Sequence, residues 1–181
     1  MLKNILVRRA IYKDVAVMKE ICEENLLDLN CEKTMLKDFA NRGFLMSRMD
    51  EKYTQNMIVD EKNYIVLVAE SGGEIMGYLT ACDISKIANE FKNEIEQLEN
   101  HRILYYKQIA KKSGLKGVGK ALILELFDEA KCRNYTSILC KIVHEPLHNR
   151  ASDAFHGKYG FKQLRVAQEE GRMVGIYLKK L

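Results

Sequence analysis

Three glycines at short spacing form the stretch of this sequence that is best suited to bind an anion. Gly114, Gly117 and Gly119 follow the pattern G-x-x-G-x-G between a short apolar segment and a segment with helical periodicity. A glycine-rich turn that leads into a helix leaves backbone N–H groups without intrahelical partners at the positive end of the helix dipole. Such a turn binds a phosphate or pyrophosphate, so the sequence predicts a phosphorylated ligand.

Two nucleotide sites compete for this turn. Residues 114–120 match the start of a P-loop, G-x-x-x-x-G-K, but Ala121 stands where a Ser or Thr would ligate Mg²⁺. A dinucleotide site fits less well, because the glycine spacing is the reverse of G-x-G-x-x-G. A P-loop-like nucleotide binder is therefore kept as the least favoured of three candidate functions.

A second group of polar residues recurs at helical spacing near the end of the chain. Asn149, Ser152, His156 and Tyr159 fall within about 80° of one another on a helical wheel, beside an apolar face. Histidine has an ordinary pKa near 6.5, so it can donate or accept a proton near neutral pH. This flank is therefore a candidate for proton transfer as well as for ligand binding.

The elements that must position these residues follow from apolar periodicity and turn residues. The expected strands are 4–9, 64–69, 75–82, 101–111, 137–143, 161–166 and 173–178. The expected helices are 12–29, 33–40, 53–59, 84–100, 120–133 and 149–159. Asn149 is expected to cap the last helix, and Thr54 to cap the helix over 53–59.

This order predicts a mixed α/β (α+β) fold. The sheet has six to seven strands, mostly antiparallel, with one parallel pair formed by 101–111 and 137–143 around a right-handed crossover. Four to five helices are expected to flank it, and 84–100 is interpreted as a helical insertion. The length of 181 residues predicts a single domain over 1–181.

Composition excludes several classes of protein. The net charge is +4 and no block of like charges occurs, which argues against a nucleic-acid partner. No apolar run approaches the roughly 20 residues of a membrane span, and the first residues carry no leader signal. No spacing of His and Cys resembles a metal site. The five unpaired cysteines predict a reducing, cytoplasmic compartment.

Three motifs, in order, resemble those of the GNAT superfamily of N-acetyltransferases over residues 6–178. The glycine turn is close to the family's Q/R-x-x-G-x-G/A, and 149–161 is close to N-x-x-A-x-x-F-Y-x-x-x-G-F. The hairpin over 69–78 is typical of the same family. The resemblance implies an acyltransferase that takes acetyl-CoA as co-substrate and transfers its acetyl group to a primary amine, without a metal.

The resemblance also implies which residues hold acetyl-CoA. The pyrophosphate is expected on the amides of Leu115, Lys116, Gly117, Val118, Gly119 and Lys120. The pantetheine arm is expected to pair with the strand residues Ile109, Ala110 and Lys111. Further contacts are expected from the polar flank of the last helix, at Asn149, Ser152 and His156.

The sequence departs from the family pattern at three positions. Gly114 stands at the Q/R position, Ser152 at the alanine, and His156 at the tyrosine that often protonates the leaving thiolate. Lys112 or Lys116 could replace the missing Q/R side chain. His156 is the candidate acid with Tyr159 as its substitute, and His156→Ala is expected to lower kcat more than acetyl-CoA affinity. The candidate bases are Tyr105, Tyr106, His144 and Glu145.

The expected mechanism is direct attack by the amine on acetyl-CoA in a ternary complex, with a nucleophilic role of Cys140 as the less favoured route. A backbone N–H near Ile109 would polarise the acetyl carbonyl. The expected acceptor is a small-molecule or peptide amine. Its pocket is expected to come from the first two helices, from the region 44–59 and from the insertion over 84–100. A homodimer is left open. The competing function is a non-catalytic acyl-CoA-binding regulatory module on the same fold.

Overall fold

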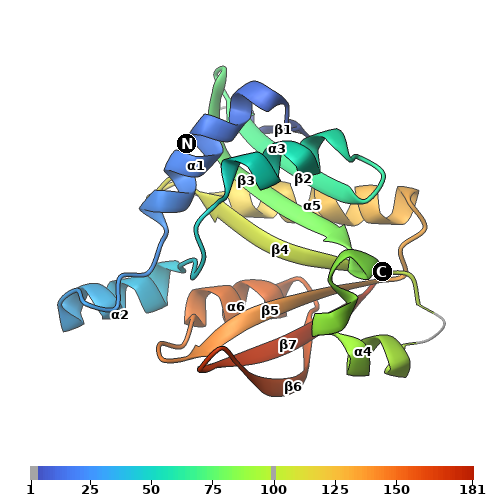
Figure 1. Cartoon of the computed structure of the whole chain (residues 1–181). Coiled ribbons are helices and arrows are strands. Elements are labelled where there is room, and N and C mark those ends of the chain that lie inside the picture. The colour runs from blue at the N-terminus through green and yellow to red at the C-terminus, as the bar shows by residue number, and fades with distance from the viewer. Residues whose placement is uncertain (1–3, 99–100) are drawn as a thin grey trace.

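The computed structural model describes residues 4–98 and 101–181, and its strands form one seven-stranded sheet (Figure 1). The spatial order is β1-β2-β3-β4-β5-β7-β6. Every neighbouring pair is antiparallel except β4 and β5, which confirms the expected single parallel pair. The bounds are β1 Leu6–Arg9, β2 Tyr64–Ser71, β3 Glu74–Asp83, β4 Ile103–Lys111, β5 Ser137–Glu145, β6 Lys162–Glu169 and β7 Arg172–Lys180.

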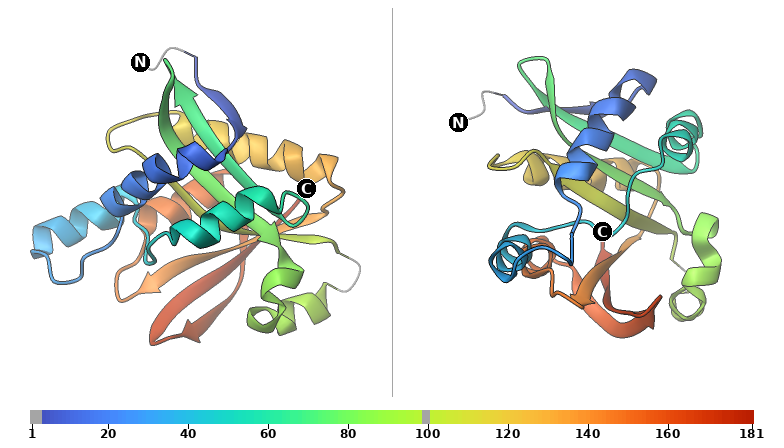
Figure 2. Two further views of the ribbon diagram at one scale, coloured as in Figure 1. Left: turned by 45° about the horizontal axis from the view of Figure 1, so that its top comes forward. Right: turned by 60° about the vertical axis from the view of Figure 1, so that its left-hand side comes forward.

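Helices cover both faces of this sheet (Figures 1 and 2). Over the first strands, α1 and α3 lie on one face and α5 on the other, while α6 lies behind β5. The described residues form six α-helices and two 3-10 helices, and each of the six expected helices has an α-helical counterpart. They are η1 Tyr12–Asp14, α1 Val15–Glu24, α2 Lys33–Arg42, α3 Glu51–Val59, η2 Ile84–Glu90, α4 Lys92–Gln97, α5 Val118–Cys132 and α6 Arg150–Lys158.

The continuous apolar run of β2 reflects burial on both sides. Ile65 and Leu67 pack into the core under α5, whereas Val66 and Val68 pack into the core under α1 and α3. Alternate residues of a strand point to opposite faces, so a strand between two helical layers needs apolar residues throughout. A third core lies under η2 and α4, where Phe91 is fully buried.

Three expected helices differ from the structure. The helix over 12–29 ends at Glu24, because the next residues turn into a bridge between Leu26 and Leu45. The helix α3 begins earlier than expected, since Asp50, not Thr54, accepts the capping hydrogen bond. The expected helix over 84–100 is a 3-10 segment followed by the short α4, with a break at Ile87. Its last two positions, 99–100, lie outside the described residues.

The strands β4 and β5 run side by side only at their start. Pairing spans Ile103 to Tyr106 on β4 and ends where Tyr106 meets Cys140. On its other edge, β4 has a register shift that leaves Lys107 without an opposite residue on β3. A bulge of this kind bends a strand and increases its twist. The bulge therefore lies at the point where β4 bends away from β5 and the sheet opens.

Within the described residues, no helix is both long enough and apolar enough to span a bilayer.

Candidate active site

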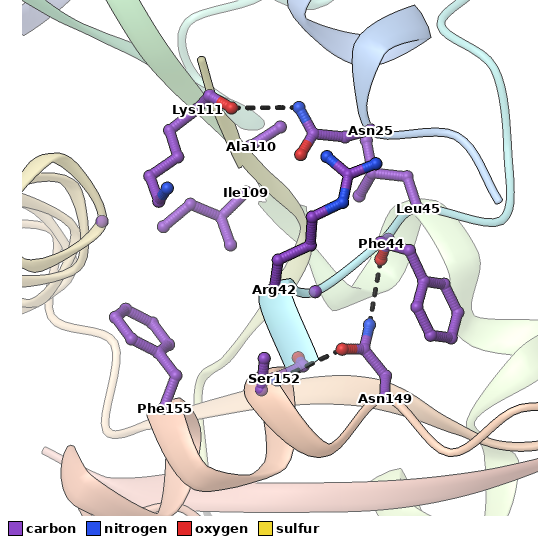
Figure 3. Close-up of a pocket in the computed structure, with 13 residues that line it drawn as sticks. Asn25, Arg42, Phe44, Leu45, Ile109, Ala110, Lys111, Asn149, Ser152 and Phe155 are labelled. Atoms are coloured by element: carbon purple, nitrogen blue, oxygen red, sulfur yellow. Dashed lines mark hydrogen bonds between the residues drawn. The ribbon is translucent and has the colours of Figure 1, made fainter. Parts of the chain in front are cut away.

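A cavity of about 180 Å³ lies between the C-terminal end of β4 and the start of α6 (Figure 3). One wall is the end of β4, a second is α6, and the third is formed by the end of α1 and the segment that follows α2. Its lining residues are Asn25, Arg42, Gly43, Phe44, Leu45, Ile109, Ala110, Lys111, Gly119, Asn149, Ala151, Ser152 and Phe155.

The end of β4 presents backbone groups to this cavity. The Lys112 N–H donates to the Met76 carbonyl at 2.9 Å, so the Lys112 backbone faces β3. Because strand residues alternate in direction, the backbone groups of Ile109 and Lys111 face away from β3, toward the opening. The Asn25 side chain already donates to the Lys111 carbonyl at 3.0 Å. Because the pairing of β4 with β5 ends at Tyr106, the N–H and carbonyl of Ile109 and the N–H of Lys111 have no strand partner among the described residues, and they suit an extended ligand.

The start of α5 offers a second set of backbone donors. Gly117 precedes the helix with a φ of +89°, a left-handed conformation that favours glycine. The Ala121 N–H is bonded to the Gly117 carbonyl at 3.0 Å, so the preceding N–H groups of Val118, Gly119 and Lys120 have no partner within the helix. These three N–H groups suit an anion at the helix start.

The expected cofactor-binding residues divide into three groups by position. Six line the cavity: Ile109, Ala110, Lys111, Gly119, Asn149 and Ser152. Five surround the start of α5 without lining the cavity: Leu115, Lys116, Gly117, Val118 and Lys120. The remaining residue, His156, is buried and lies outside the lining.

Asn149 joins α6 to the segment that follows α2. Its Oδ1 accepts from the Ser152 N–H at 3.2 Å, which confirms the expected helix cap. Its Nδ2 donates to the Phe44 carbonyl at 2.9 Å. The Asn149 side chain therefore fixes the third wall of the cavity against α6, and it is buried in doing so.

His156 lies in the core under β4 rather than on the cavity surface. Its Nδ1 is 2.6 Å from the Ser152 carbonyl, which can only accept, so Nδ1 carries the proton. Burial lowers the pKa of His156, although the Ser152 carbonyl opposes this effect. The ring is therefore neutral near pH 7. Its buried Nε2 is a free acceptor, without a hydrogen-bond partner among the described residues.

Tyr106 lies next to His156, with 5.3 Å between the ring centroids. Its hydroxyl is also buried and lacks a hydrogen-bond partner in the described part of the chain. Burial raises the pKa of Tyr106 well above 10, so the hydroxyl keeps its proton at neutral pH. Tyr106 is the last residue of β4 that pairs with β5, so its backbone lies at the base of the opening, while its hydroxyl is enclosed in the core beside His156 and does not line the cavity.

The other candidate groups are occupied elsewhere. Tyr159 packs on Phe155, with 4.9 Å between the ring centroids. Tyr105 packs on Phe91 in the core beneath η2 and α4, on the opposite face of β4 from Tyr106. The Nε2 of His144 lies 3.2 Å from the Tyr177 hydroxyl. Burial raises the pKa of Cys140 well above 9, which keeps its sulfur a thiol and a weak nucleophile.

The sequence did not reveal the third wall of the cavity. Asn25, Arg42, Phe44 and Leu45 belong to no motif and lie far along the chain from the glycine turn. Only the fold brings them to β4 and α6. Within residues 4–98 and 101–181, no group of three or more His, Cys, Asp or Glu is arranged to hold a metal ion.

Solved structures share this fold at low sequence identity. A PaiA N-acetyltransferase from Thermoplasma acidophilum, in complex with coenzyme A, has a TM-score of 0.69 and 16% identity. The comparison covers 99% of this chain and 100% of that one. YncA from Salmonella typhimurium, a proposed acetyltransferase with its cofactor acetyl-CoA, has a TM-score of 0.65 and 17% identity, covering 98% and 94%.

The ribosomal-protein-S18-alanine N-acetyltransferase of Escherichia coli has a TM-score of 0.67 and 13% identity, covering 98% of this chain and 94% of that one. No curated protein matches the sequence. The family model of the GNAT acetyltransferases matches residues 33–161, which are more than half of the 181 residues. With the opening between β4 and β5 and the glycine turn before α5, this match shows that the chain belongs to the GNAT acetyltransferase family.

Proposed function

We propose that the chain transfers an acetyl group from acetyl-CoA to a primary amine by direct attack in a ternary complex. The backbone edge at the end of β4, followed by three N–H groups without an intrahelical partner at the start of α5, supports this proposal most directly. The pantetheine arm pairs with Ile109 and Lys111, and the pyrophosphate binds at the α5 amides. The thioester then lies at the base of the opening, beside the last β4–β5 pair.

The reaction needs no further reactant. The amine nitrogen forms a bond to the acetyl carbon, the carbon–sulfur bond breaks, and the sulfur keeps the electron pair. One proton leaves the amine for water, and one proton reaches the sulfur to give CoA. The chain's own contribution is to hold the thioester in line with the amine and to stabilise the negative charge that develops on oxygen and sulfur.

We assign the stabilisation of the leaving sulfur to Tyr106, with His156 as its neighbour. A thiol has an ordinary pKa near 8.5, far below that of this buried phenol, so Tyr106 donates a hydrogen bond without losing its proton. His156 is neutral with Nδ1 bonded to Ser152, so it cannot donate from Nε2. We therefore assign His156 the role of packing against Tyr106, in place of the acid role expected from sequence.

The experiment is continuous detection of released thiol with acetyl-CoA and a panel of amines. The panel contains small amines and peptides that begin with alanine. The peptides are included because one structural neighbour is named as a ribosomal-protein-S18-alanine N-acetyltransferase. Tyr106→Phe should lower kcat by about 10- to 100-fold, as loss of a hydrogen bond to a charged group does, and leave the Kd of acetyl-CoA unchanged.

Tyr105→Phe is the matched control, because Tyr105 is also buried but on the opposite face of β4, and this variant should keep the wild-type kcat. An unchanged kcat in Tyr106→Phe would remove this role. Binding of acetyl-CoA without amine-dependent thiol release would favour the alternative, a non-catalytic acyl-CoA-binding module.

A further inference from the structure

The charged side chains that line the cavity are of one sign. Among its described lining residues, the charged side chains are Arg42 from α2 and Lys111 from β4, both cationic, and no carboxylate lines the cavity. A concave site lined by like charges attracts a ligand of the opposite sign. The cavity therefore suits an anionic group, and Arg42 comes from α2, far along the chain from the glycine turn.

Arg42 is held so that its guanidinium extends into the cavity. It is the last residue of α2, and Gly43 ends the helix there with a φ of +89°. The guanidinium carbon lies 4.4 Å from the centre of the Phe39 ring, and its Nε lies 3.0 Å from an Asp38 oxygen. Figure 3 shows the side chain extending from α2 toward Asn25 and the strand end at Lys111.

The glycine turn itself offers no comparable side chain. Gly114 has no side chain, and a Cβ added there would meet no atom within 4 Å. Lys112 has its ammonium 3.8 Å from Glu74, away from the cavity lining. Lys116 and Lys120 are exposed and do not line the cavity.

Arg42 and Lys111 also act on each other. Burial lowers the pKa of Lys111, and the positive charge of Arg42 lowers it further. Asp38 already pairs with the Arg42 Nε, and an anion bound between Arg42 and Lys111 would relieve the repulsion that remains between the two cations. The position along β4 identifies which anion fits. Lys111 is the last residue of β4. It lies at the end of the strand nearest to the α5 amides and farthest from Tyr106, where the pairing with β5 ends.

We propose that Arg42 supplies the side chain that Gly114 lacks, and that it binds the pyrophosphate of coenzyme A together with Lys111. This inference rests on the proposed function, since it takes coenzyme A as the ligand of this cavity. A guanidinium binds phosphate oxygens through two parallel N–H groups, which an ammonium cannot do. Arg42 thereby makes α2, on the side expected to hold the acceptor, part of the cofactor site.

The test compares coenzyme A with S-acetylpantetheine, which has the pantetheine arm but no phosphate, by calorimetric titration. Arg42→Ala should raise the Kd of coenzyme A about tenfold, as loss of a charge-assisted hydrogen bond does, and leave the Kd of S-acetylpantetheine unchanged. The salt dependence of coenzyme A binding should also become shallower. Arg42→Lys should recover part of the loss.

Arg48→Ala is the control, because Arg48 is an exposed arginine on the segment that follows α2 and lies outside this cavity. Its affinity for coenzyme A should equal that of the wild type. An unchanged Kd in Arg42→Ala would overturn the inference, as would an equal loss for both ligands, which would indicate a packing role. If the wild-type chain itself does not bind coenzyme A, the proposed function fails instead.

Discussion

At the scale of single residues, the structure changes the meaning of His156. An acid role is expected from sequence because His156 stands at the family's tyrosine position, and periodicity places it on one flank with Asn149 and Ser152. Periodicity does not show how deeply a side chain is buried. The structure turns His156 into the core against Tyr106, and its Nδ1 proton is used by the Ser152 carbonyl. By contrast, the cap at Asn149 was predictable, since a helix cap depends only on local sequence.

A pH dependence of stability follows from the burial of His156. Because its folded pKa is lowered, the folded chain binds fewer protons than the unfolded chain below the ordinary pKa of 6.5. The free energy of unfolding is therefore highest above pH 6.5, and it falls as the pH drops toward the lowered pKa of His156. Urea unfolding at pH 7.5 and pH 5.5 should show this loss.

The glutamine variant His156→Gln should lose less stability over the same pH interval, because glutamine does not titrate. Part of the loss should remain, since burial also lowers the pKa of His144. An identical loss in wild type and His156→Gln would show that His156 does not carry the effect.

At the scale of elements, close packing of β3, β4 and α5 positions the edge that faces the cavity. Gly77 on β3 lies opposite Lys111, and a Cβ there would come within 2.7 Å of the Ala110 carbonyl and 2.6 Å of Val118. The expected strands and the parallel pair were read correctly from sequence, because apolar runs and turns are local signals. The bulge at Lys107, which opens the sheet, depends on strand register, and register is a long-range property.

Gly77→Ala should weaken both the fold and the site. The added methyl group meets backbone atoms that cannot rotate away, so we expect a loss of about 1–3 kcal/mol in the free energy of unfolding. A shift of Ala110 and Lys111 should also raise the Kd of acetyl-CoA. Urea unfolding and calorimetric titration measure the two effects.

Gly157→Ala is the matched control within α6, where an added Cβ meets nothing within 4 Å. There the same change should stabilise the chain by about 0.5–1 kcal/mol, because alanine favours the helix. If Gly77→Ala were as stable as the wild type, the close packing of β3 on β4 would not be the constraint described here.

At the scale of the whole molecule, the order of elements and three motifs identified the fold, but they identified only two walls of the cavity. Those walls, the end of β4 and the start of α6, carry the motifs. The third wall is made by Asn25, Arg42, Phe44 and Leu45, which are brought in by the Leu26–Leu45 bridge and the Asn149–Phe44 hydrogen bond. Neither contact leaves a periodic signal in the sequence, so the third wall required the structure.

The central claim is that acetyl-CoA binds to the folded chain between β4 and α6. Equilibrium unfolding at increasing acetyl-CoA concentration tests it most directly, because a ligand that binds only the folded state adds about 2.7 kcal/mol at one hundred times its Kd. Above the Kd, we predict about 1.4 kcal/mol more stability for each tenfold rise in acetyl-CoA, and no stabilisation by Mg-ATP. Stability that does not change with acetyl-CoA would contradict the account.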